Sequence, residues 1–259
     1  MPALLVLLAV VGLAVGSFLN VVVWRVPRGE SVVAPGSHCP SCAAAVRTRD
    51  NVPVLSWLLL RGRCRDCGTP ISLRYPLVEL LTAAVFVVLG ARLGASWELP
   101  AYLYLGALGV ALALIDLDVK RLPNVLVLPA YAVAPLLLTV PAVLDDRWPD
   151  LGRALLGGAA LYAGYFALAF AYPAGMGFGD VKLAGVLGIY LGWLGWGPLA
   201  AGAFLGFLLG GVVGVALLAG RRATRKTAIP YGPFMLVGAL LGVLAGSSIT
   251  GAYLDVIGV

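Results

Sequence analysis

Long apolar stretches separated by short polar segments dominate the hydrophobic pattern of this chain. A helix needs about 20 apolar residues to cross the hydrocarbon core of a bilayer, and eight stretches come close to that length. We place them at about 3–24, 76–93, 100–117, 124–143, 152–172, 181–196, 198–219 and 232–254. The pattern therefore predicts an all-α polytopic membrane protein with about eight transmembrane helices.

The composition agrees with a membrane protein. Hydrophobic residues make up 61% of the 259 residues and charged residues only 12%, with a mean hydropathy of +0.99. Soluble domains carry about 25% charged residues. The net charge of +6 could suggest nucleic acid, but the sequence has no soluble nucleic-acid-binding domain. We expect a lipid bilayer around the chain and no nucleic-acid partner.

The positions of lysine and arginine predict the orientation, because basic residues gather in cytoplasmic loops. The segment from Arg25 to Arg74 holds eight arginines. If this segment is cytoplasmic, the N-terminus lies outside and 15 of the 18 basic residues fall inside. The three on the outer side are Arg92, Arg147 and Arg153. A basic loop rather than a small-residue cleavage site follows the first stretch, so we interpret that stretch as an uncleaved span.

A polar loop at 25–75 separates the first span (1–24) from a seven-helix membrane domain (76–259) and contains two C-x-x-C pairs. The cysteines are Cys39, Cys42, Cys64 and Cys67. The 21 residues between the pairs lie just beyond the usual zinc spacing of about 20. Four thiolates can hold zinc tetrahedrally and leave no open position, so we expect a structural zinc site that folds the loop.

Disulfides or free thiols are the alternative for these cysteines, and a cytoplasmic loop disfavours disulfides. The single histidine, His38, precedes Cys39 and is more simply a bystander than a ligand. The sequence therefore offers no histidine for a catalytic triad elsewhere.

Four acids lie near the predicted membrane boundaries, and an acid in a membrane span is a candidate functional group. They are Glu79, Asp116, Asp118 and Asp180. Asp116 and Asp118 point about 200° apart on a helix, so only one can face a given partner. Asp116 is the deeper of the two, whereas Asp118 suits the headgroup layer. Glu79 is at least as easily explained as a structural partner of an arginine.

The sequence GMGFGD at 175–180 places glycines and a carboxylate between two apolar stretches. Non-helical backbone is tolerated at this depth only where protein or a water-filled cavity covers it. We expect a broken helix start, in which Gly177 and Gly179 permit positive φ and close approach of a substrate backbone. In the predicted topology Asp180 and Asp116 lie at the same cytoplasmic edge. Two neighbouring carboxyl groups that share a proton could hydrolyse a peptide bond without a metal.

These residues resemble a known family, the type IV prepilin peptidases, also called leader peptidase/N-methyltransferases. Gly177-Phe178-Gly179-Asp180 matches the GxGD motif of intramembrane aspartyl proteases. The other matches, in order, are GSFLNVVVWRVP at 16–27, the two C-x-x-C pairs, DNVPVLSW at 50–57, RYPLVELLTA at 74–83 and IDLDVKRLPN at 115–124. The family often has Asp in place of Asn124. The resemblance covers nearly the full length, and the ordered set is far more specific than any single motif.

The resemblance implies that Asp116 and Asp180 are the catalytic aspartates and that the four cysteines bind zinc. It implies cleavage of the short basic leader of prepilins or pseudopilins, for a pilus or secretion system, at the cytoplasmic face of the bacterial inner membrane. Many members of the family then use S-adenosylmethionine to methylate the new N-terminal residue, and the intact cysteine loop favours this bifunctional form, since members that lack the loop look like peptidases only. No glycine fingerprint marks the methyl-donor site, and Gly62 and Arg63 are our candidates for shaping it.

Two alternatives remain at this point. One is a peptidase without methyl transfer. The other is a transporter that uses the paired acids as an ion relay. A transporter typically has its site near the midplane and paired repeats, whereas here both acids lie at one face and the sequence shows no repeat.

Overall fold

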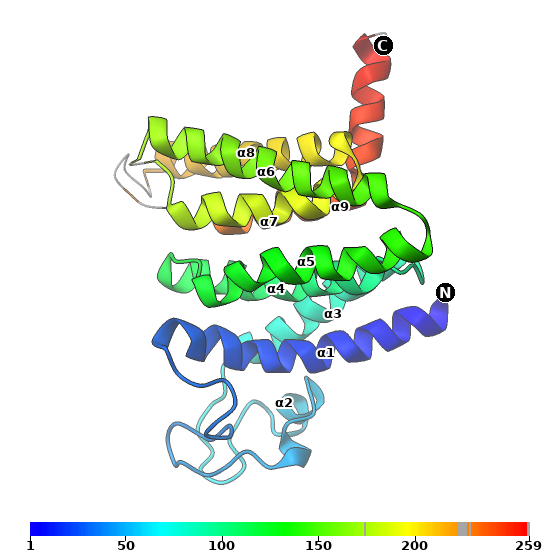
Figure 1. Cartoon of the computed structure of the whole chain (residues 1–259). Helices are drawn as coiled ribbons and strands as arrows, with labels where there is room; N and C mark the ends of the chain where they lie inside the picture. The colour runs from blue at the N-terminus through cyan, green and yellow to red at the C-terminus, as the bar shows by residue number, and fades with distance from the viewer. Residues whose placement is uncertain (174, 222–226, 228, 258–259) are drawn as a thin grey trace. The chain divides into compact units, whose positions relative to one another are not determined.

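The computed structural model describes residues 1–173, 175–221, 227 and 229–257, and long helices account for most of them (Figure 1). The long helices are α1 (Pro2–Arg25), α3 (Arg74–Leu93), α4 (Leu99–Val119), α5 (Asn124–Leu144), α6 (Trp148–Ala171), α7 (Phe178–Leu194), α8 (Trp196–Ala219) and α9 (Gly232–Ile257). The loop after α1 contains two short 3-10 helices, η1 (Val26–Arg28) and η2 (Thr48–Asp50), and the short helix α2 (Leu55–Leu59).

The eight predicted spans correspond one to one to these eight long helices. In the described residues, seven of them are long and apolar enough to cross a membrane: α1, α3, α4, α5, α6, α8 and α9. The eighth, α7, has 17 residues, which is the lower limit for a helix that crosses the hydrocarbon core. The prediction of an all-α polytopic membrane protein is confirmed, and α7 is shorter than the other seven.

The chain divides into two compact units, Met1–Ala111 and Leu112–Val259, with the boundary inside α4. In the first unit, α1 packs against α3 through glycines. A methyl group on Gly12 would lie 2.6 Å from Ala83 Cα, and one on Gly16 would lie 2.7 Å from Glu79 Cα. Small residues let the two backbones approach closely, which is how membrane helices gain packing energy in lipid.

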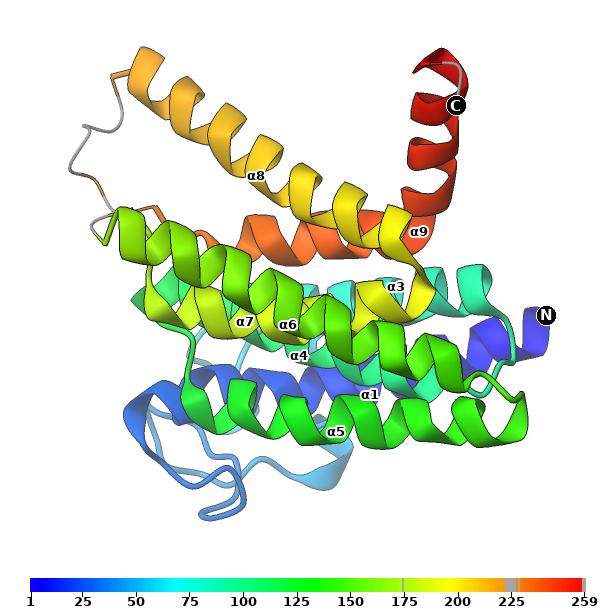
Figure 2. The same ribbon diagram turned by 45° about the horizontal axis from the view of Figure 1, so that its top comes forward.

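In the second unit, α7 is the central helix. It contacts α5, α6, α8 and α9, and it buries 13 of its 17 residues. Figure 2 shows α6 and α7 side by side. Their contact again depends on glycines, since a methyl group on Gly157 would lie 2.7 Å from the Gly188 carbonyl oxygen. A helix that is apolar on all sides needs such neighbours on all sides.

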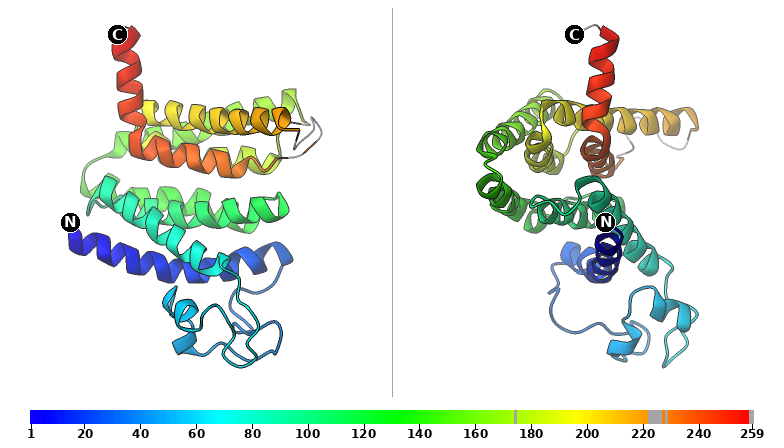
Figure 3. Two further views of the ribbon diagram at one scale, coloured as in Figure 1. Left: turned by 180° about the vertical axis from the view of Figure 1, so that it is seen from behind. Right: turned by 90° about the vertical axis from the view of Figure 1, so that its right-hand side faces the viewer.

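The last helix, α9, runs along α8 and then turns away sharply, as the left view in Figure 3 shows. Its C-terminal part contains Gly246, Ser247 and Ser248. The Thr250 hydroxyl donates a hydrogen bond to the Gly246 carbonyl oxygen at 2.9 Å. Glycine–serine sequences and side-chain hydrogen bonds of this type bend helices.

Candidate active site and cysteine cluster

Asp180 lies in the first turn of α7, where it caps its own helix. Gly177 is the N-cap residue, and its N–H donates a hydrogen bond to Asp180 Oδ2 at 3.1 Å. The carboxylate therefore interacts with the free N–H groups and the positive end of the helix dipole. The broken helix start predicted from GMGFGD is present, and it presents a buried carboxylate.

The two glycines of this motif do not use positive φ, which corrects our expectation. Gly177 has φ −74° and ψ 145°, and Gly179 lies within the helix. Instead, both positions lack room for a side chain, and glycine has none. A methyl group on Gly177 would lie 3.2 Å from Asp180 Oδ2, and one on Gly179 would lie 3.2 Å from Leu122 Cβ. Gly179 thus allows the start of α7 to pack tightly against the segment between α4 and α5.

Asp116 lies in the last turn of α4 and is buried, with 5% of its surface exposed. Its Oδ2 accepts a hydrogen bond at 3.0 Å from the N–H of Gly232, which is the first residue of α9. Asp118, two residues on, is exposed. Asp116 thus faces inward and Asp118 outward, whereas the placement of Asp118 in the headgroup layer stays a prediction.

The structure brings the two aspartates together. Asp116 lies close enough to Asp180 for their charges to interact. Leu122 links their surroundings, because a methyl group on Gly179 would meet its Cβ and one on Gly232 would lie 3.3 Å from its Cδ2. Each aspartate thus has its Oδ2 held by a glycine N–H, one within the same turn and one from a distant helix.

Gly232 is a site residue that the sequence analysis did not find. It lies in the sequence PYGP at 230–233, where two prolines flank Tyr231 and Gly232 at the start of an apolar stretch. That pattern is a helix-start signal, so by itself it indicated a boundary and not a contact with an acid. The contact joins residues 116 positions apart, which spacing alone does not reveal.

A second set of contacts attaches the start of α7 to α5. Lys182 Nζ donates a hydrogen bond to Asn124 Oδ1 at 3.0 Å and lies 4.9 Å from the centre of the Phe178 ring. The Tyr131 hydroxyl donates to the Lys182 carbonyl oxygen at 2.7 Å. Gly185 makes room for this hydroxyl, because any side chain there would overlap it. Asp180 therefore lies on a helix turn that α5 holds at two points.

The four cysteines form a compact cluster in the loop after α1. One sulfur from each lies within 4.8 Å of all the others, and none of the four is in a disulfide. Cys39 Sγ and Cys67 Sγ are 3.7 Å apart. Tetrahedral zinc with bonds of about 2.3 Å requires sulfurs about 3.8 Å apart, so this donor set fits zinc.

Each C-x-x-C pair forms the same tight turn. The Cys39 N–H donates to the Ala44 carbonyl and the Cys64 N–H to the Thr69 carbonyl. The residue after each pair has positive φ, which is 58° at Ala43 and 71° at Gly68. The Thr69 hydroxyl, 3.3 Å from Cys67 Sγ, and the Thr69 backbone lower the pKa of the Cys67 thiol to about 6, whereas the neighbouring thiols raise the pKa of Cys42 to about 12. The four thiols therefore differ in acidity, and it is the spacing of their sulfurs that fits a metal.

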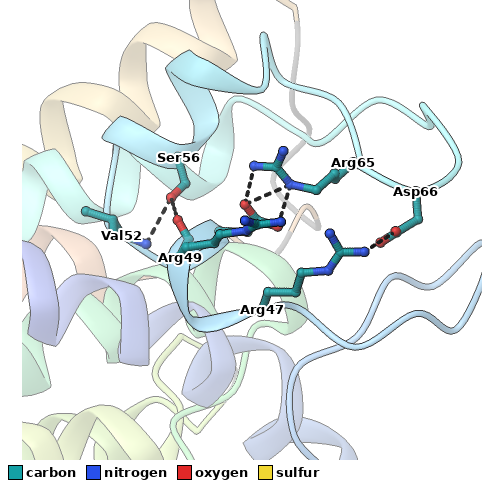
Figure 4. Close-up of polar contacts among 7 residues, drawn as sticks. Arg47, Arg49, Val52, Ser56, Arg65 and Asp66 are labelled. Atoms are coloured by element: carbon teal, nitrogen blue, oxygen red, sulfur yellow. Dashed lines mark hydrogen bonds and ion pairs between the residues drawn. The ribbon is translucent and has the colours of Figure 1, made fainter.

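Ion pairs join the two halves of the loop (Figure 4). Arg65 forms a bidentate pair with Asp50, with Nη2 2.6 Å from Oδ1, and Arg47 Nη2 lies 2.7 Å from Asp66 Oδ1. The Arg65 guanidinium lowers the pKa of Asp50 below its usual value. The two residues between Cys64 and Cys67 therefore each bind the segment at 47–50, and this connects the cysteine turns without a hydrophobic core.

The other candidate residues in the loop and at the start of α3 make structural contacts. His38 Nδ1 hydrogen-bonds the Gly36 carbonyl oxygen at 3.1 Å, in keeping with a bystander. Glu79, buried in α3, accepts a hydrogen bond from the Val54 N–H at 2.7 Å and so attaches the loop to a span. Gly62 has φ +66°, and a methyl group there would lie 2.8 Å from the Trp57 ring. A role of Gly62 and Arg63 in binding the methyl donor stays a prediction.

Two aspartates on separate membrane helices, one of them in a GxGD sequence, are the arrangement of a membrane aspartyl peptidase. Comparison with known families gives two matches. The bacterial peptidase A24 N-terminal domain matches residues 10–93, and the type IV leader peptidase family matches residues 102–218. The resemblance stated from the sequence is thus confirmed, and the chain belongs to the type IV leader peptidase family.

Curated relatives are similar over most of their length. A prepilin leader peptidase/N-methyltransferase of Aeromonas hydrophila is 38% identical, covering 93% of this chain and 91% of the relative. Proteins of the same name from Myxococcus xanthus and Pseudomonas aeruginosa are 41% and 35% identical. The Myxococcus xanthus match covers 87% of this chain and 67% of the relative, and the Pseudomonas aeruginosa match covers 95% of this chain and 92% of the relative. No solved structure matches this chain significantly.

Proposed function

We propose that this protein is a membrane aspartyl endopeptidase that cleaves the short basic leader of type IV prepilins or pseudopilins and then methylates the new N-terminal residue. The observation that carries the proposal is the buried pair Asp116 and Asp180, each with one oxygen held by a glycine N–H. Family membership and the names of the relatives support the substrate class and the second activity.

In this proposal the two carboxyl groups share one proton, because two like charges in a water-poor site do not ionise together readily. The glycine N–H groups occupy Oδ2 of each aspartate. The other oxygen of each group can then contact a water molecule and the substrate. Fixed orientation of the reacting groups is a large part of enzymatic rate enhancement.

The hydrolysis then follows general acid–base chemistry. The ionised carboxylate takes a proton from water as the water oxygen attacks the carbonyl carbon of the scissile bond. The protonated carboxyl group donates its proton to the carbonyl oxygen. When the tetrahedral intermediate collapses, the C–N bond breaks and the amine nitrogen takes up a proton. The products are a leader with a new carboxylate and a membrane segment with a new amine.

The new amine is the group that the second activity modifies. S-adenosylmethionine, when bound, supplies the methyl group. We assign zinc to the four cysteines, where it folds the loop and does no chemistry, because a four-cysteine cage leaves no open position. We place the methyl-donor site in this loop, with Gly62 and Arg63 as candidates, so we expect the loop to matter more for methyl transfer than for cleavage.

For the topology we propose that the N-terminus lies outside and that Asp116 and Asp180 lie at the cytoplasmic face of the bacterial inner membrane. The basic loop and the distribution of lysine and arginine support this orientation. The substrate then has its basic leader in the cytoplasm and its apolar helix in the membrane. Release of a tagged leader on the outer side would contradict both the topology and the placement of the site.

The experiment that tests the function is mass spectrometry of a prepilin incubated with the purified protein, with and without S-adenosylmethionine. We expect loss of the leader in both samples and an added methyl mass only with the methyl donor. Cleavage without methylation would show a peptidase that lacks methyltransferase activity, and an unchanged prepilin would contradict the proposal.

The role of zinc can be tested on the same preparation. Replacing Cys64 and Cys67 by Ser removes half of the donor set, so we expect zinc release and unfolding of the loop. Methyl transfer should fall at least about tenfold further than cleavage, which is catalysed in the membrane. Measured zinc content, product mass and cleavage rate check this. Normal methylation by zinc-free protein would refute the proposed role of the loop.

A further inference from the structure

The turn before α9 contains a feature that the catalytic pair depends on. The Gly232 N–H is the hydrogen-bond donor to Asp116, and the bond is buried. The glycine also lies against the carboxylate, since a methyl group there would be 2.9 Å from Oδ2 and 3.4 Å from Cγ of Asp116. A contact below 3.0 Å cannot persist, so any larger residue at 232 must displace the Asp116 carboxylate.

The turn is itself fixed by aromatic packing. The Tyr231 ring lies 5.8 Å from Phe207 of α8 and 6.5 Å from Tyr165 of α6, measured between ring centres. Gly210 of α8 makes room for it, because a methyl group there would lie 2.8 Å from Tyr231 Cε2. The Tyr231 carbonyl accepts the N–H of Phe234 at 3.1 Å, which starts α9. The Gly232 N–H therefore points in a direction set by three helices.

From this geometry we infer that the turn at 230–233 is a third element of the catalytic site and that Gly232 is a positioning residue for Asp116. The inference rests on the proposed peptidase function. Asp180 needs no such partner, because Gly177, three residues before it in the chain, holds its oxygen. Asp116 lies at the end of α4, where no N–H of its own helix is free. Among the described residues, the donor shown for its carboxylate is the distant Gly232 N–H.

The test is Gly232→Ala in the full chain, with a prepilin as substrate. We expect kcat for leader cleavage to fall about 100-fold, because a displacement of about 1 Å at a reacting group costs that much, while KM stays within about twofold. Methyl transfer to a pilin that has already lost its leader should stay normal, as should the melting temperature in detergent. The matched control is Gly251→Ala in the same helix, where a methyl group meets no atom within 4 Å.

A second variant keeps the inference testable if Gly232→Ala does not fold. Gly210→Ala pushes on the Tyr231 ring without touching Asp116, so we expect a smaller loss in kcat of about three- to tenfold. A normal kcat in a folded Gly232→Ala protein, or in Gly210→Ala if the first variant does not fold, would overturn the inference alone. Absence of cleavage by the unaltered chain would overturn both the inference and the proposed function.

Discussion

The two ends of α7 are built in opposite ways. At its start, two glycines and a short carboxylate leave little side-chain bulk, and the Asp180 carboxylate accepts the N–H of the N-cap residue, Gly177. At its end, the long side chain of Arg153 donates two hydrogen bonds to the last carbonyls, from Nε to Gly192 at 2.8 Å and from Nη2 to Trp193 at 2.7 Å. One end presents a carboxylate whose Oδ2 accepts the Gly177 N–H, and the other binds its last carbonyl oxygens with a charged guanidinium.

Two arginines at the far end share one carboxylate partner. Asp150 pairs with Arg147 at 2.6 Å and with Arg153 at 2.7 Å, and the Arg147 guanidinium lies 4.5 Å from the centre of the Trp193 ring. Cations near a helix C-terminus are favourable because of its dipole. This difference indicates that hydrogen bonds and ion pairs fix the C-terminal end of α7, whereas the N-terminal end carries the candidate catalytic carboxylate.

The largest expected effect comes from removing the acids at the site. Asp180→Asn or Asp116→Asn takes away a group that must accept or donate a proton, so cleavage should fall by on the order of 10⁴-fold. The protein should still accumulate in the membrane. Asp118→Asn is the matched control, because its side chain is exposed, and it should keep most activity. Cleavage rates in detergent check this, and full activity of either first variant would reject the assignment.

The next prediction concerns the far end of α7, where we expect a substitution to lower the stability of the protein. Arg153→Met keeps much of the side-chain volume but leaves two backbone carbonyls without a charged donor. We expect a loss of about 2 kcal/mol in the free energy of unfolding, with normal cleavage per folded molecule. Thermal unfolding in detergent measures it, with Arg121→Met, which removes an exposed cation, as control. A strong loss of kcat without loss of stability would show that the two ends are not divided in this way.

The smallest effect concerns how the start of α7 is held. Lys182→Met removes the hydrogen bond to Asn124 and the contact of the charge with Phe178. We expect kcat to fall about three- to tenfold and stability by less than about 1 kcal/mol. Asn124→Asp should keep activity, because a carboxylate accepts the same hydrogen bond more strongly. Lys120→Met, an exposed lysine, is the control, and a larger effect there than at Lys182 would argue against the contact.

Much of the fold and part of the site follow from the sequence because they depend on neighbouring residues. A membrane helix satisfies its backbone within one segment, so apolar length alone predicts the spans. Asp180 and Gly177 lie within one helix turn, and the spacing of GxGD already places them together. The two C-x-x-C pairs likewise predict two metal-binding turns, whose sulfurs are in reach of one ion in the structure.

Tertiary structure alone decided the contacts that join distant helices. Gly232 donates to Asp116 through its backbone N–H, and Arg153 binds the backbone carbonyls of Gly192 and Trp193. Nearly every residue carries these backbone groups, so no residue type in the sequence marks which of them will be used. Gly177 and Gly179 show the same limit, because the sequence predicted their freedom of φ whereas packing uses their small size. The sequence thus determined which side chains can do chemistry, and helix packing determined which backbone groups hold them in place.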